Sequence, residues 1–334
     1  MLADARVVYV ILYVRNLARS KQYYEKVLGL RCIEQDDGAL KYDAGQVIVC
    51  LNRAADYGIE LPKSRDNSTD IVFLVDDIGV YRSAMEKRGV EFTPTVKYEI
   101  GQIADFYDPD GHWFTLYEPS ETAMGWPSGP KLNAMQRLQP KRSSLVASAA
   151  EDERSQQLGL DGVSVIYLFL FVLDAQLSCE FYGQQLGLTV LEGGQCSQTQ
   201  SGNDDDVVKY EVGSMMLATH HTTGTSFTED VKYDLSEHSS PPRDVDPSRT
   251  HGAAIVFHVH EIAEVAAEMA KKGVNIESPR HSAIGGIAKF VDPSNHLFYL
   301  YEPSQDALRL PSGTKLKEIL ATPIAACLPT TTIA

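Results

Sequence analysis

Cysteine is scarce in this sequence. The 334 residues contain five cysteines, Cys32, Cys50, Cys179, Cys196 and Cys327, and no two of them form a CxxC pair. The odd number and the wide spacing argue against a disulfide framework and against a zinc site built from thiolates. The opening stretch "MLADARVVYVILYV" also lacks the small-residue cleavage site of a secretory signal. We therefore expect a protein of a reducing, cytoplasmic compartment.

Long hydrophobic runs and basic charge are lacking as well. The longest apolar stretch, "VSVIYLFLFVLDA", ends at Asp174 and is too short to span a bilayer. Thirty Lys and Arg residues face 45 Asp and Glu residues, so the net charge is −15. Nucleic acids and anionic membranes require clustered cations, so we expect neither as a partner. A neutral or cationic small molecule is compatible with this charge.

What the sequence does contain is a long internal repeat. The stretch "DFYDPDGHWFTLYE" at 105–118 recurs as "KFVDPSNHLFYLYE" at 289–302, and the tails "YEPSETAMGWPSGPKL" and "YEPSQDALRLPSGTKL" continue the match. Further upstream, "YVRNLARSKQYYEKVLGL" at 13–30 recurs as "FVLDAQLSCEFYGQQLGL" at 171–188. A repeat of this length indicates a duplicated domain. We predict a first domain at 1–135, a linker at 136–160, a second domain at 161–320 and a tail at 321–334.

Each copy consists of two similar halves. In the first half, 7–14 alternates and is rich in β-branched residues, which predicts a strand, and Asn16 offers an N-cap for the helix that follows. The second half repeats this order with a strand at 70–75 and a helix capped by Asp76 or Asp77. Three strands follow each helix. The chain is therefore predicted to form an α+β fold of four β-α-β-β-β units.

A hairpin turn explains the conserved spacing inside the repeated stretch. Pro109 presets the backbone for a turn, and Gly111 suits its left-handed position, where the second copy has Asn295. Because strand side chains alternate between faces, His112 and Glu118 point away from the face of Thr115. The same holds for His296 and Glu302. We predict that these histidines and glutamates belong to the scaffold and bind no metal.

The motif "V-R-N-L-A-R-S-x-x-Y-Y-x-x-V-L-G-L" and the later "F-Y-D-P-D-G-H", in a four-unit layout, resemble the vicinal oxygen chelate superfamily. That group includes glyoxalase I, extradiol dioxygenases, fosfomycin-resistance enzymes and bleomycin-resistance binding proteins. The resemblance covers roughly 7–119 and 163–303 and implies two tandem domains, each with curved mixed sheets around a cavity. In its metalloenzymes, up to four strands each supply one metal ligand. The superfamily hosts several chemistries, so the resemblance predicts the fold better than the function.

The residues at the implied ligand positions do not favour a metal. The first copy has Tyr9, Cys50, Asp70 and Thr115 there, and the second has Tyr167, Ala218, Ala254 and Tyr299. A divalent site needs three or four converging N, O or S ligands. We therefore predict no cofactor. The alternative is a rebuilt divalent-metal site in the second copy, formed by His220, His258 and His260, with His221 and His251 nearby.

The concave face of each copy is instead predicted to carry aromatic side chains with one carboxylate, as in many small-molecule pockets. The candidate ligand-binding residues are Tyr9, Tyr13, Cys50, Asp70, Trp113, Thr115 and Tyr117 in the first copy, with Tyr167, Phe169, His258 and Tyr299 in the second. No catalytic residue is assigned.

Two classes of function follow. The first is a metal-independent binding protein of the bleomycin-resistance kind, with a planar or cationic small molecule as its ligand. The second is an enzyme: a lyase, isomerase or extradiol-type dioxygenase with a rebuilt metal site, or an acid–base catalyst using Asp70 with Tyr9. One copy could also serve purely as structural support. A monomer or a homodimer is compatible with either class.

Overall fold

A computed structural model describes residues 1–61, 66–138, 158–193, 207–221 and 252–322. Each quarter of the chain has one strand, one helical segment and three further strands, as predicted. The first quarter contains β1 (Arg6–Val14), α1 (Leu17–Gln22), η1 (Tyr23–Val27), β2 (Arg31–Gln35), β3 (Ala39–Asp43) and β4 (Ile48–Arg53). The second contains β5 (Asp66–Leu74), α2 (Ile78–Glu86), β6 (Val96–Tyr98), β7 (Gly101–Tyr107) and β8 (His112–Pro119).

The second copy repeats this order. Its first half contains β9 (Val165–Val172), α7 (Ala175–Cys179), η3 (Glu180–Gln185), β10 (Val190–Glu192), β11 (Val207–Glu211) and β12 (Met216–His221). Its second half contains β13 (Ala253–His258), α8 (Ile262–Lys271), β14 (Arg280–Ser282), β15 (Gly285–Val291) and β16 (Leu297–Pro303). Short 3-10 turns, η2 (Ala54–Tyr57) and η4 (Ala307–Arg309), follow β4 and β16. The predicted N-caps are confirmed, because Asn16 accepts from the Arg19 amide and Asp77 from the Val80 amide.

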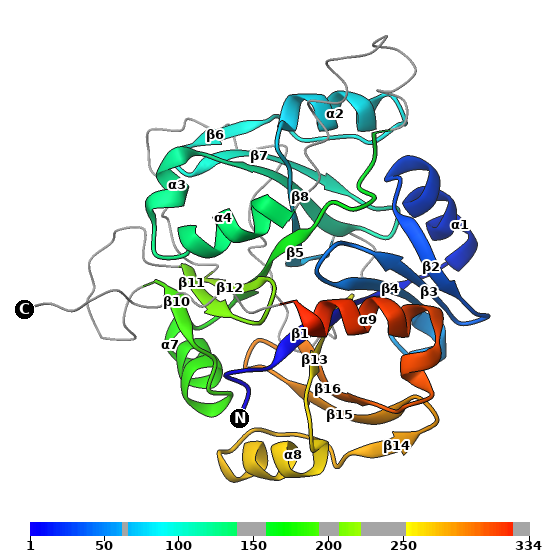
Figure 1. The fold of residues 1–334 in the computed structure, drawn as a ribbon, viewed down its shortest axis with the longest axis vertical. Helices are drawn as coiled ribbons and strands as arrows, with labels where there is room; N and C mark the ends of the chain where they lie inside the picture. Colours follow the sequence, from blue (N-terminus) through cyan, green and yellow to red (C-terminus); the bar gives the residue numbers. More distant parts are fainter. Residues whose placement is uncertain (62–65, 139–157, 194–206, 222–251, 323–334) are drawn as a thin grey trace, which may run out of the picture.

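The strands form two eight-stranded mixed sheets, and each sheet draws on both copies (Figure 1). Sheet A has the order β14-β15-β16-β13-β1-β4-β3-β2, and sheet B has the order β10-β11-β12-β9-β5-β8-β7-β6. The two copies meet in antiparallel pairs at the centre of each sheet, β1 with β13 and β5 with β9. Neither sheet closes on itself. The first unit therefore pairs with the fourth, and the second with the third.

This pairing corrects one prediction. Tyr9 and Asp70 were predicted to share one concave face because they belong to one copy. In the structure Tyr9 lies in sheet A and Asp70 in sheet B. The repeat could not show which units pair. Pairing within one copy and pairing between the copies would use the same similar units and differ only in which strand edges meet.

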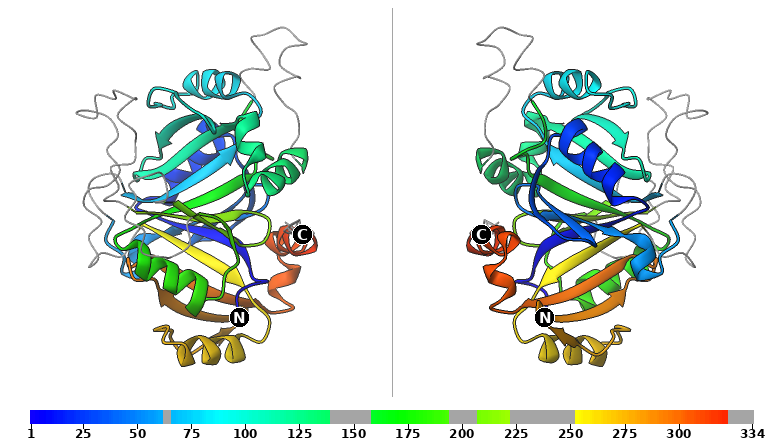
Figure 2. Two further views of the ribbon diagram at one scale, coloured as in Figure 1. Left: turned by 90° about the vertical axis from the view of Figure 1, so that its left-hand side faces the viewer. Right: turned by 90° about the vertical axis from the view of Figure 1, so that its right-hand side faces the viewer.

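One face of each sheet packs into a common core. Its buried side chains come from β1, β4, β5, β8, β9, β13 and β16 together with the helices. Figure 2 shows α2 and α8 at opposite ends of the long axis. Apolar side chains that leave water on folding stabilise such a core by roughly 25 cal/mol per Å². Among the helices of the described residues, none combines the length and hydrophobicity that a membrane span requires.

The repeated turn ties the two sheets together, which confirms the scaffold role of its histidines. His112 Nδ1 lies 2.9 Å from Asp108 Oδ2, and its Nε2 lies 3.0 Å from the Gly252 carbonyl oxygen. His296 makes the same two bonds, to Asp292 at 2.9 Å and to the Ser68 carbonyl at 3.0 Å. Since a carboxylate and a carbonyl can only accept, each ring carries both of its protons in this geometry.

Other predictions about this stretch are also confirmed. The backbone is left-handed at Gly111, with φ of 91°, and at Asn295, with φ of 66°. Glu118 accepts the Ile78 amide at 2.8 Å, and Glu302 accepts the Ile262 amide at 3.2 Å. The two glutamates thus bind the N-termini of α2 and α8, where the helix dipole favours an anion.

Two tails complete the fold. The first copy ends in α3 (Glu121–Gly125) and α4 (Gly129–Leu138), and the second ends in α9 (Pro311–Ala321). Both α4 and α9 lie on the same side of the molecule (Figure 2). Leu316 and Ile319 of α9 pack on Tyr9, Val256 and Tyr301 of sheet A. We call the sheet surface beneath α9 face A and the corresponding surface beneath α4 face B.

Candidate functional site

The strand register regroups the predicted site residues by sheet. Face A carries Tyr9, Ile11 and Tyr13 of β1, Cys50 of β4, Ala254, Val256 and His258 of β13, and Leu297 and Tyr299 of β16. Face B carries Asp70 and Val72 of β5, Trp113, Thr115 and Tyr117 of β8, Tyr167, Phe169 and Phe171 of β9, and Ala218 of β12. The candidates therefore form two separate groups.

Three polar side chains meet at the centre of face B. Thr115 Oγ1 lies 3.0 Å and 2.9 Å from the two carboxyl oxygens of Asp70, and 2.7 Å from Oδ1 of Asp105. The exposed fractions of Asp70, Thr115 and Asp105 are 6%, 3% and 7%. Asp105 comes from β7, directly opposite Thr115 in the hairpin. We call these three residues the acidic cluster.

The acidic cluster can hold a proton between its two carboxyls. A threonine hydroxyl has one proton and can donate it to one acceptor at a time, so the second short contact is favourable only if a carboxyl donates. Burial and the neighbouring Asp105 charge hold the pKa of Asp70 well above its ordinary value. Burial also raises the pKa of Asp105, and the Thr115 hydroxyl opposes that rise. The pKa is thus raised at both carboxyls, and the pair can keep one proton that the two residues share through Thr115.

Aromatic rings surround the acidic cluster. The Trp113 and Phe171 rings stack with centroids 5.2 Å apart and an interplanar angle of 5°. Tyr107 also stacks with Trp113, with ring centroids 6.2 Å apart. Phe169, which pairs in register with Asp70, lies 5.4 Å from Tyr167. Such rings offer flat apolar surfaces that suit another planar ring or a cation.

Face A has the same architecture without the acid. Ala254 stands where face B has Asp70, Tyr299 stands in place of Thr115, and Lys289 replaces Asp105. The Tyr13 and Tyr299 hydroxyl oxygens lie 3.4 Å apart, and burial is the main cause that raises the pKa of both phenols. The Tyr57 ring, which is 54% exposed, lies 5.4 Å from Tyr13.

The model of the Glyoxalase/Bleomycin resistance protein/Dioxygenase superfamily matches residues 6–116 and 164–300. The chain belongs to this superfamily. No curated protein matches the sequence.

Two solved structures cover nearly the whole chain. Glyoxalase I from Zea mays is 17% identical, with a TM-score of 0.56, and the match covers 95% of this chain and 97% of that one. A putative dioxygenase from Bacillus subtilis subsp. subtilis str. 168 is 13% identical, with a TM-score of 0.55 and coverage of 97% and 98%. At such low identity these similarities establish the fold alone. The α+β fold of two tandem superfamily domains is thereby confirmed.

The metal that many superfamily enzymes use does not fit the residues present. At the four strand positions, sheet A offers Tyr9, Cys50, Ala254 and Tyr299, whereas sheet B offers Asp70, Thr115, Tyr167 and Ala218. Burial raises the pKa of the Cys50 thiol to about 12, so it stays protonated at neutral pH. Within the described ranges, no three His, Cys, Asp or Glu side chains converge as metal ligands would. We therefore derive no step through a metal.

The rebuilt histidine site is not formed by the described residues. His220 lies in sheet B beside Phe171, with ring centroids 5.5 Å apart, whereas His258 lies in sheet A beside His260, at 4.7 Å. His221 Nε2 lies 3.0 Å from the Leu173 carbonyl oxygen. Burial, His260 and Arg6 lower the pKa of His258 to about 4. His251 lies outside the described residues.

Sequence reasoning also missed two groups of residues. Asp105 was overlooked, although counting back from the Asp108–Gly111 turn places it opposite Thr115. The tail helices were not recognised as part of either face, although their repeated "PSG-x-KL" pattern was visible. The acid–base pair of Asp70 with Tyr9 is wrong, because the two residues lie in different sheets, and Asp70 has Thr115 and Asp105 as its partners instead.

Proposed function

We propose that this protein binds a small planar cation on face B and that it does so without a metal. The observation that carries the proposal is the acidic cluster, in which two buried carboxyls share one hydroxyl. A ligand N–H or a delocalised positive charge can replace the shared proton, while Trp113 and Phe169 contact the rest of a planar molecule. This form of recognition needs no coordination bond.

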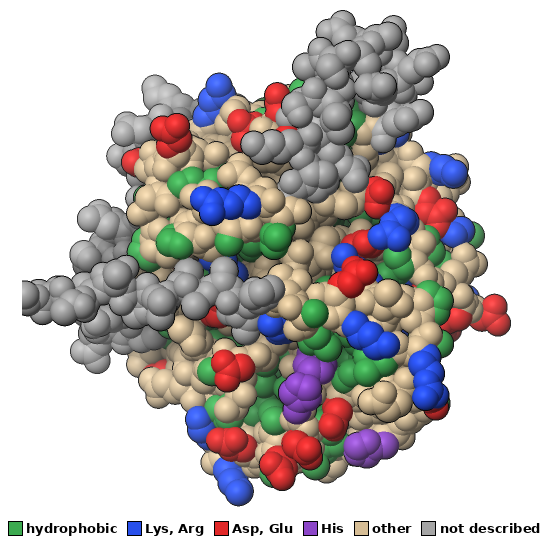
Figure 3. Space-filling model, in the orientation of Figure 1, with side chains coloured by type: hydrophobic (Ala, Val, Ile, Leu, Met, Phe, Trp, Pro, Cys, Tyr) green, Lys and Arg blue, Asp and Glu red, His purple; other side chains and the backbone are tan. Residues whose placement is uncertain are grey.

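The charge of the whole chain supports the same ligand class. A net charge of −15 attracts cations toward the protein and repels anions. Over the side of the molecule shown in Figure 3, basic side chains of the described residues are interspersed with acidic ones. Face A lacks both carboxyls of the cluster, so we expect it to contribute little to binding of a cation.

The proposal can be tested with N-methylquinolinium, a planar cation, and 1-methylnaphthalene, its uncharged analogue of the same shape. Calorimetry on the full chain should detect binding of the cation and much weaker binding of the hydrocarbon. Asp70→Asn should weaken binding of the cation by about 2 kcal/mol or more, because one of the two buried carboxyls that can neutralise the ligand's charge is lost. Asp56→Asn, which removes an exposed partner of Arg53, should leave binding unchanged.

Two results would count against the proposal. Equal affinity for the cation and the hydrocarbon would show that the carboxyls do not take part. A stoichiometric divalent metal in the purified protein, lost in Asp70→Asn, would assign the cluster to a metal instead.

A second function is supported by the shared proton. Two buried carboxyls that share one proton are suited to general acid–base chemistry next to a carbonyl group. An enzyme of this kind should catalyse deuterium exchange at the methyl group of acetophenone in D₂O, which NMR can follow. Exchange that is lost in both Asp70→Asn and Thr115→Val would favour the enzyme, and exchange at the buffer rate would favour the binding protein.

A further inference from the structure

Each tail helix has a serine at its N-terminal end, Ser128 just before α4 and Ser312 as the second residue of α9, that is held between a glutamate and a lysine of the opposite copy. At α4, the Ser128 amide donates to Glu192 Oε2 at 3.0 Å and its hydroxyl donates to the same oxygen at 2.5 Å. Lys209 Nζ donates to Glu192 Oε1 at 2.5 Å and reaches Ser128 Oγ at 3.3 Å. We call this arrangement a clasp.

The clasp at α9 is built from the equivalent residues of the other repeat. The Ser312 amide donates to Glu34 Oε2 at 2.9 Å, and Lys41 Nζ lies 2.5 Å from Glu34 Oε1 and 3.2 Å from Ser312 Oγ. Both serines are only 2% exposed. Each serine is also within hydrogen-bonding reach of a tyrosine hydroxyl on the face that its helix covers, Ser128 with Tyr167 and Ser312 with Tyr9.

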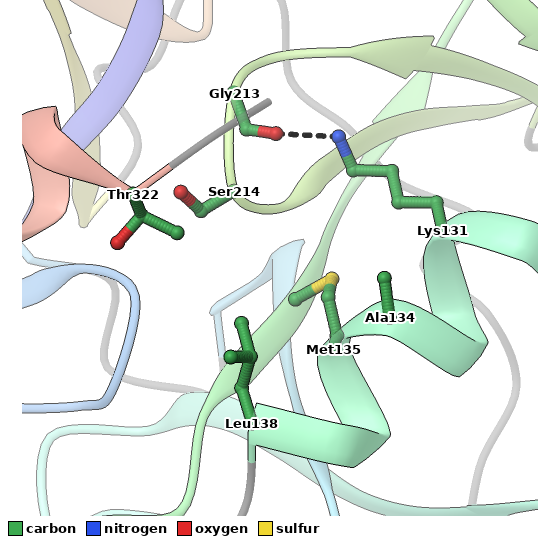
Figure 4. A pocket seen from close by; sticks show the side chains of 7 residues that line it. All are labelled: Lys131, Ala134, Met135, Leu138, Gly213, Ser214 and Thr322. Atoms are coloured by element: carbon green, nitrogen blue, oxygen red, sulfur yellow. Dashed lines mark hydrogen bonds between the residues drawn. The ribbon is translucent and has the colours of Figure 1, made fainter. Parts of the chain in front are cut away.

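One further ion pair fixes the first turn of each helix. Lys131 of α4 pairs with Glu211 and donates to the Gly213 carbonyl at 2.5 Å (Figure 4). Lys315 of α9 pairs with Asp43 at 2.8 Å. The two helices approach each other around a cavity of about 30 Å³, which Met135, Leu138 and Thr322 help to line. A water molecule fits in this space.

The apolar contact beneath each helix is small. Of the ten residues of α4, the buried ones are Gly129, Lys131, Leu132 and Met135, and of the eleven of α9 they are Ser312, Gly313, Leu316 and Ile319. Each helix therefore buries two large apolar side chains, and Leu320 of α9 packs beside them while partly exposed. A segment with so few buried apolar contacts opens locally at much lower free energy than the whole fold.

We infer that α4 and α9 are lids, each held shut over its face by one clasp and able to open without unfolding of the sheet beneath. An opened lid uncovers the buried Tyr167 and Tyr117 on face B, or Tyr9 and Tyr301 on face A. It also leaves the Glu–Lys pair of the clasp available to a ligand in place of the serine. The inference stands independently of the proposed ligand, because lid opening can be measured on the free protein.

Hydrogen exchange of the full chain tests the lids directly. Ser128→Ala should speed amide exchange in residues 129–138 by about tenfold, since one hydrogen bond that holds the lid is lost. Amides of β5 and β9 should keep the wild-type rate. Ser312→Ala is the matched control, because it should speed exchange in residues 311–321 and leave α4 unchanged.

A chemical probe gives a second, independent readout. Cys50 lies on face A opposite Lys41 of the α9 clasp, and it is 6% exposed. Ala218 is its counterpart on face B, opposite Lys209 of the α4 clasp. Mass spectrometry of the protein labelled with iodoacetamide should show about tenfold faster modification of Cys50 in Ser312→Ala, because opening exposes the thiol. In an Ala218→Cys chain, Ser128→Ala should have this effect at position 218.

Two outcomes would overturn the inference. If the serine substitutions leave exchange in both helices and labelling at both cysteines unchanged, the clasps do not hold the helices shut. If exchange rises equally in the helix and in the strands beneath it, the helix opens only when the whole domain unfolds, and it is no lid. Wild-type protein provides the same comparison, because α4 and α9 should exchange faster than β5 and β9 without any substitution.

Discussion

Face A and face B have the same framework, but the residues at their centres differ. Tyr9 and Tyr301 on face A match Tyr167 and Tyr117 on face B, with ring centroids 6.0 Å and 6.2 Å apart. The phenol oxygens of Tyr301 and Tyr117 both donate to backbone carbonyls, at 2.9 Å and 2.8 Å. The framework residues thus occupy equivalent places in both copies.

The difference between the two faces lies at three positions. Asp70, Thr115 and Asp105 on face B stand where face A has Ala254, Tyr299 and Lys289. Face B therefore concentrates buried acid, while face A has phenols and an ammonium group. A duplicated framework can keep its stability while one copy changes its polar residues, because the framework bonds do not pass through those positions. The following predictions separate the shared framework from the divergent centres.

The largest losses of stability are expected for substitutions in the shared framework, and they should be about equal in the two copies. Asp108 accepts from Tyr24 at 2.9 Å and pairs with His112, and Asp292 accepts from Tyr182 at 2.7 Å and pairs with His296. Asp108→Asn and Asp292→Asn should each lower the free energy of unfolding by roughly 3–5 kcal/mol, because each leaves a buried cation unpaired. Denaturant unfolding measures both. A difference of more than about 2 kcal/mol would mean that the copies do not share an equivalent framework.

The Asp108–His112 and Asp292–His296 pairs also determine how stability changes at low pH. The histidine partner keeps the pKa of Asp108 and of Asp292 below the ordinary value despite burial. A depressed carboxyl pKa gives stability that is present above the unfolded pKa of about 4 and is lost as pH falls through the folded pKa. The wild type should therefore lose stability below about pH 4 more steeply than either Asn variant. Melting temperatures between pH 2 and 7 check this.

The buried lysines of the two tail helices should contribute unequally to the free energy of unfolding. Lys131 is 2% exposed in its side chain and Lys315 is 16% exposed. Lys131→Met should cost roughly 3 kcal/mol because Glu211 stays buried without its partner, whereas Lys315→Met should cost about 1 kcal/mol. Equal losses in denaturant unfolding would contradict the difference in burial.

Removing an acid from face B and adding one to face A should change the free energy of unfolding in opposite directions. Asp70→Asn should stabilise the protein by about 1–2 kcal/mol at pH 8, since a buried ionisable group is replaced by a neutral one of the same shape. Ala254→Asp should destabilise it by roughly 2–4 kcal/mol, because face A offers no matching hydroxyl between two acids. If Asp70→Asn proves clearly destabilising at that pH, the cluster is a stabilising element of the fold.

The effect of Asp70→Asn on stability should depend on pH in a direction that the raised pKa of Asp70 fixes. The folded-state pKa of Asp70 is raised, so the folded protein binds more protons than the unfolded chain above about pH 4. The contribution of Asp70 to stability is therefore fully present below about pH 4, and it is lost as the pH rises through the raised folded-state pKa. The gain in melting temperature from Asp70→Asn should therefore increase from pH 4 to pH 8. A gain that is constant with pH would exclude titration of Asp70.

The smallest effect is expected at the phenol pair of face A. The Tyr13 and Tyr299 oxygens are 3.4 Å apart, which is long for a hydrogen bond between hydroxyls. Tyr13→Phe should change the free energy of unfolding by less than about 1 kcal/mol. Thr115→Val on face B removes three shorter contacts and should cost more. The reverse order would show that face A depends more on its polar contacts than face B does.

Much of the fold could be predicted because its signals are local. Asn16 and Asp77 cap their helices, Gly111 and Asn295 close their turns, and strand parity placed His112 and Glu118 on the scaffold side. Each of these inferences depends on residues only a few positions apart. The alternation of side chains along a strand likewise predicted which candidate residues of one strand share a face, and the strand register agrees.

The grouping of those residues could not be predicted. Asp70 and Tyr9 lie 61 positions apart in one copy and end in different sheets, whereas Asp70 and Phe169 lie in different copies and pair directly. Asp105 was within reach of local reasoning, since the hairpin register sets it opposite Thr115. The contacts of Ser128 with Glu192 and of Ser312 with Glu34 join distant segments, and nothing near either serine in the sequence indicates its partner.

The sequence by itself determined the four units, their turns and caps, and the side of each strand on which a residue lies. These properties depend on backbone preferences and on the alternation of side chains along a strand. The tertiary structure alone decided that the first unit joins the fourth and the second joins the third. Strand edges of similar units can pair in more than one way, and the choice depends on packing between segments far apart in the chain. That choice brings Asp70, Thr115 and Tyr167 together on face B and leaves face A without an acid.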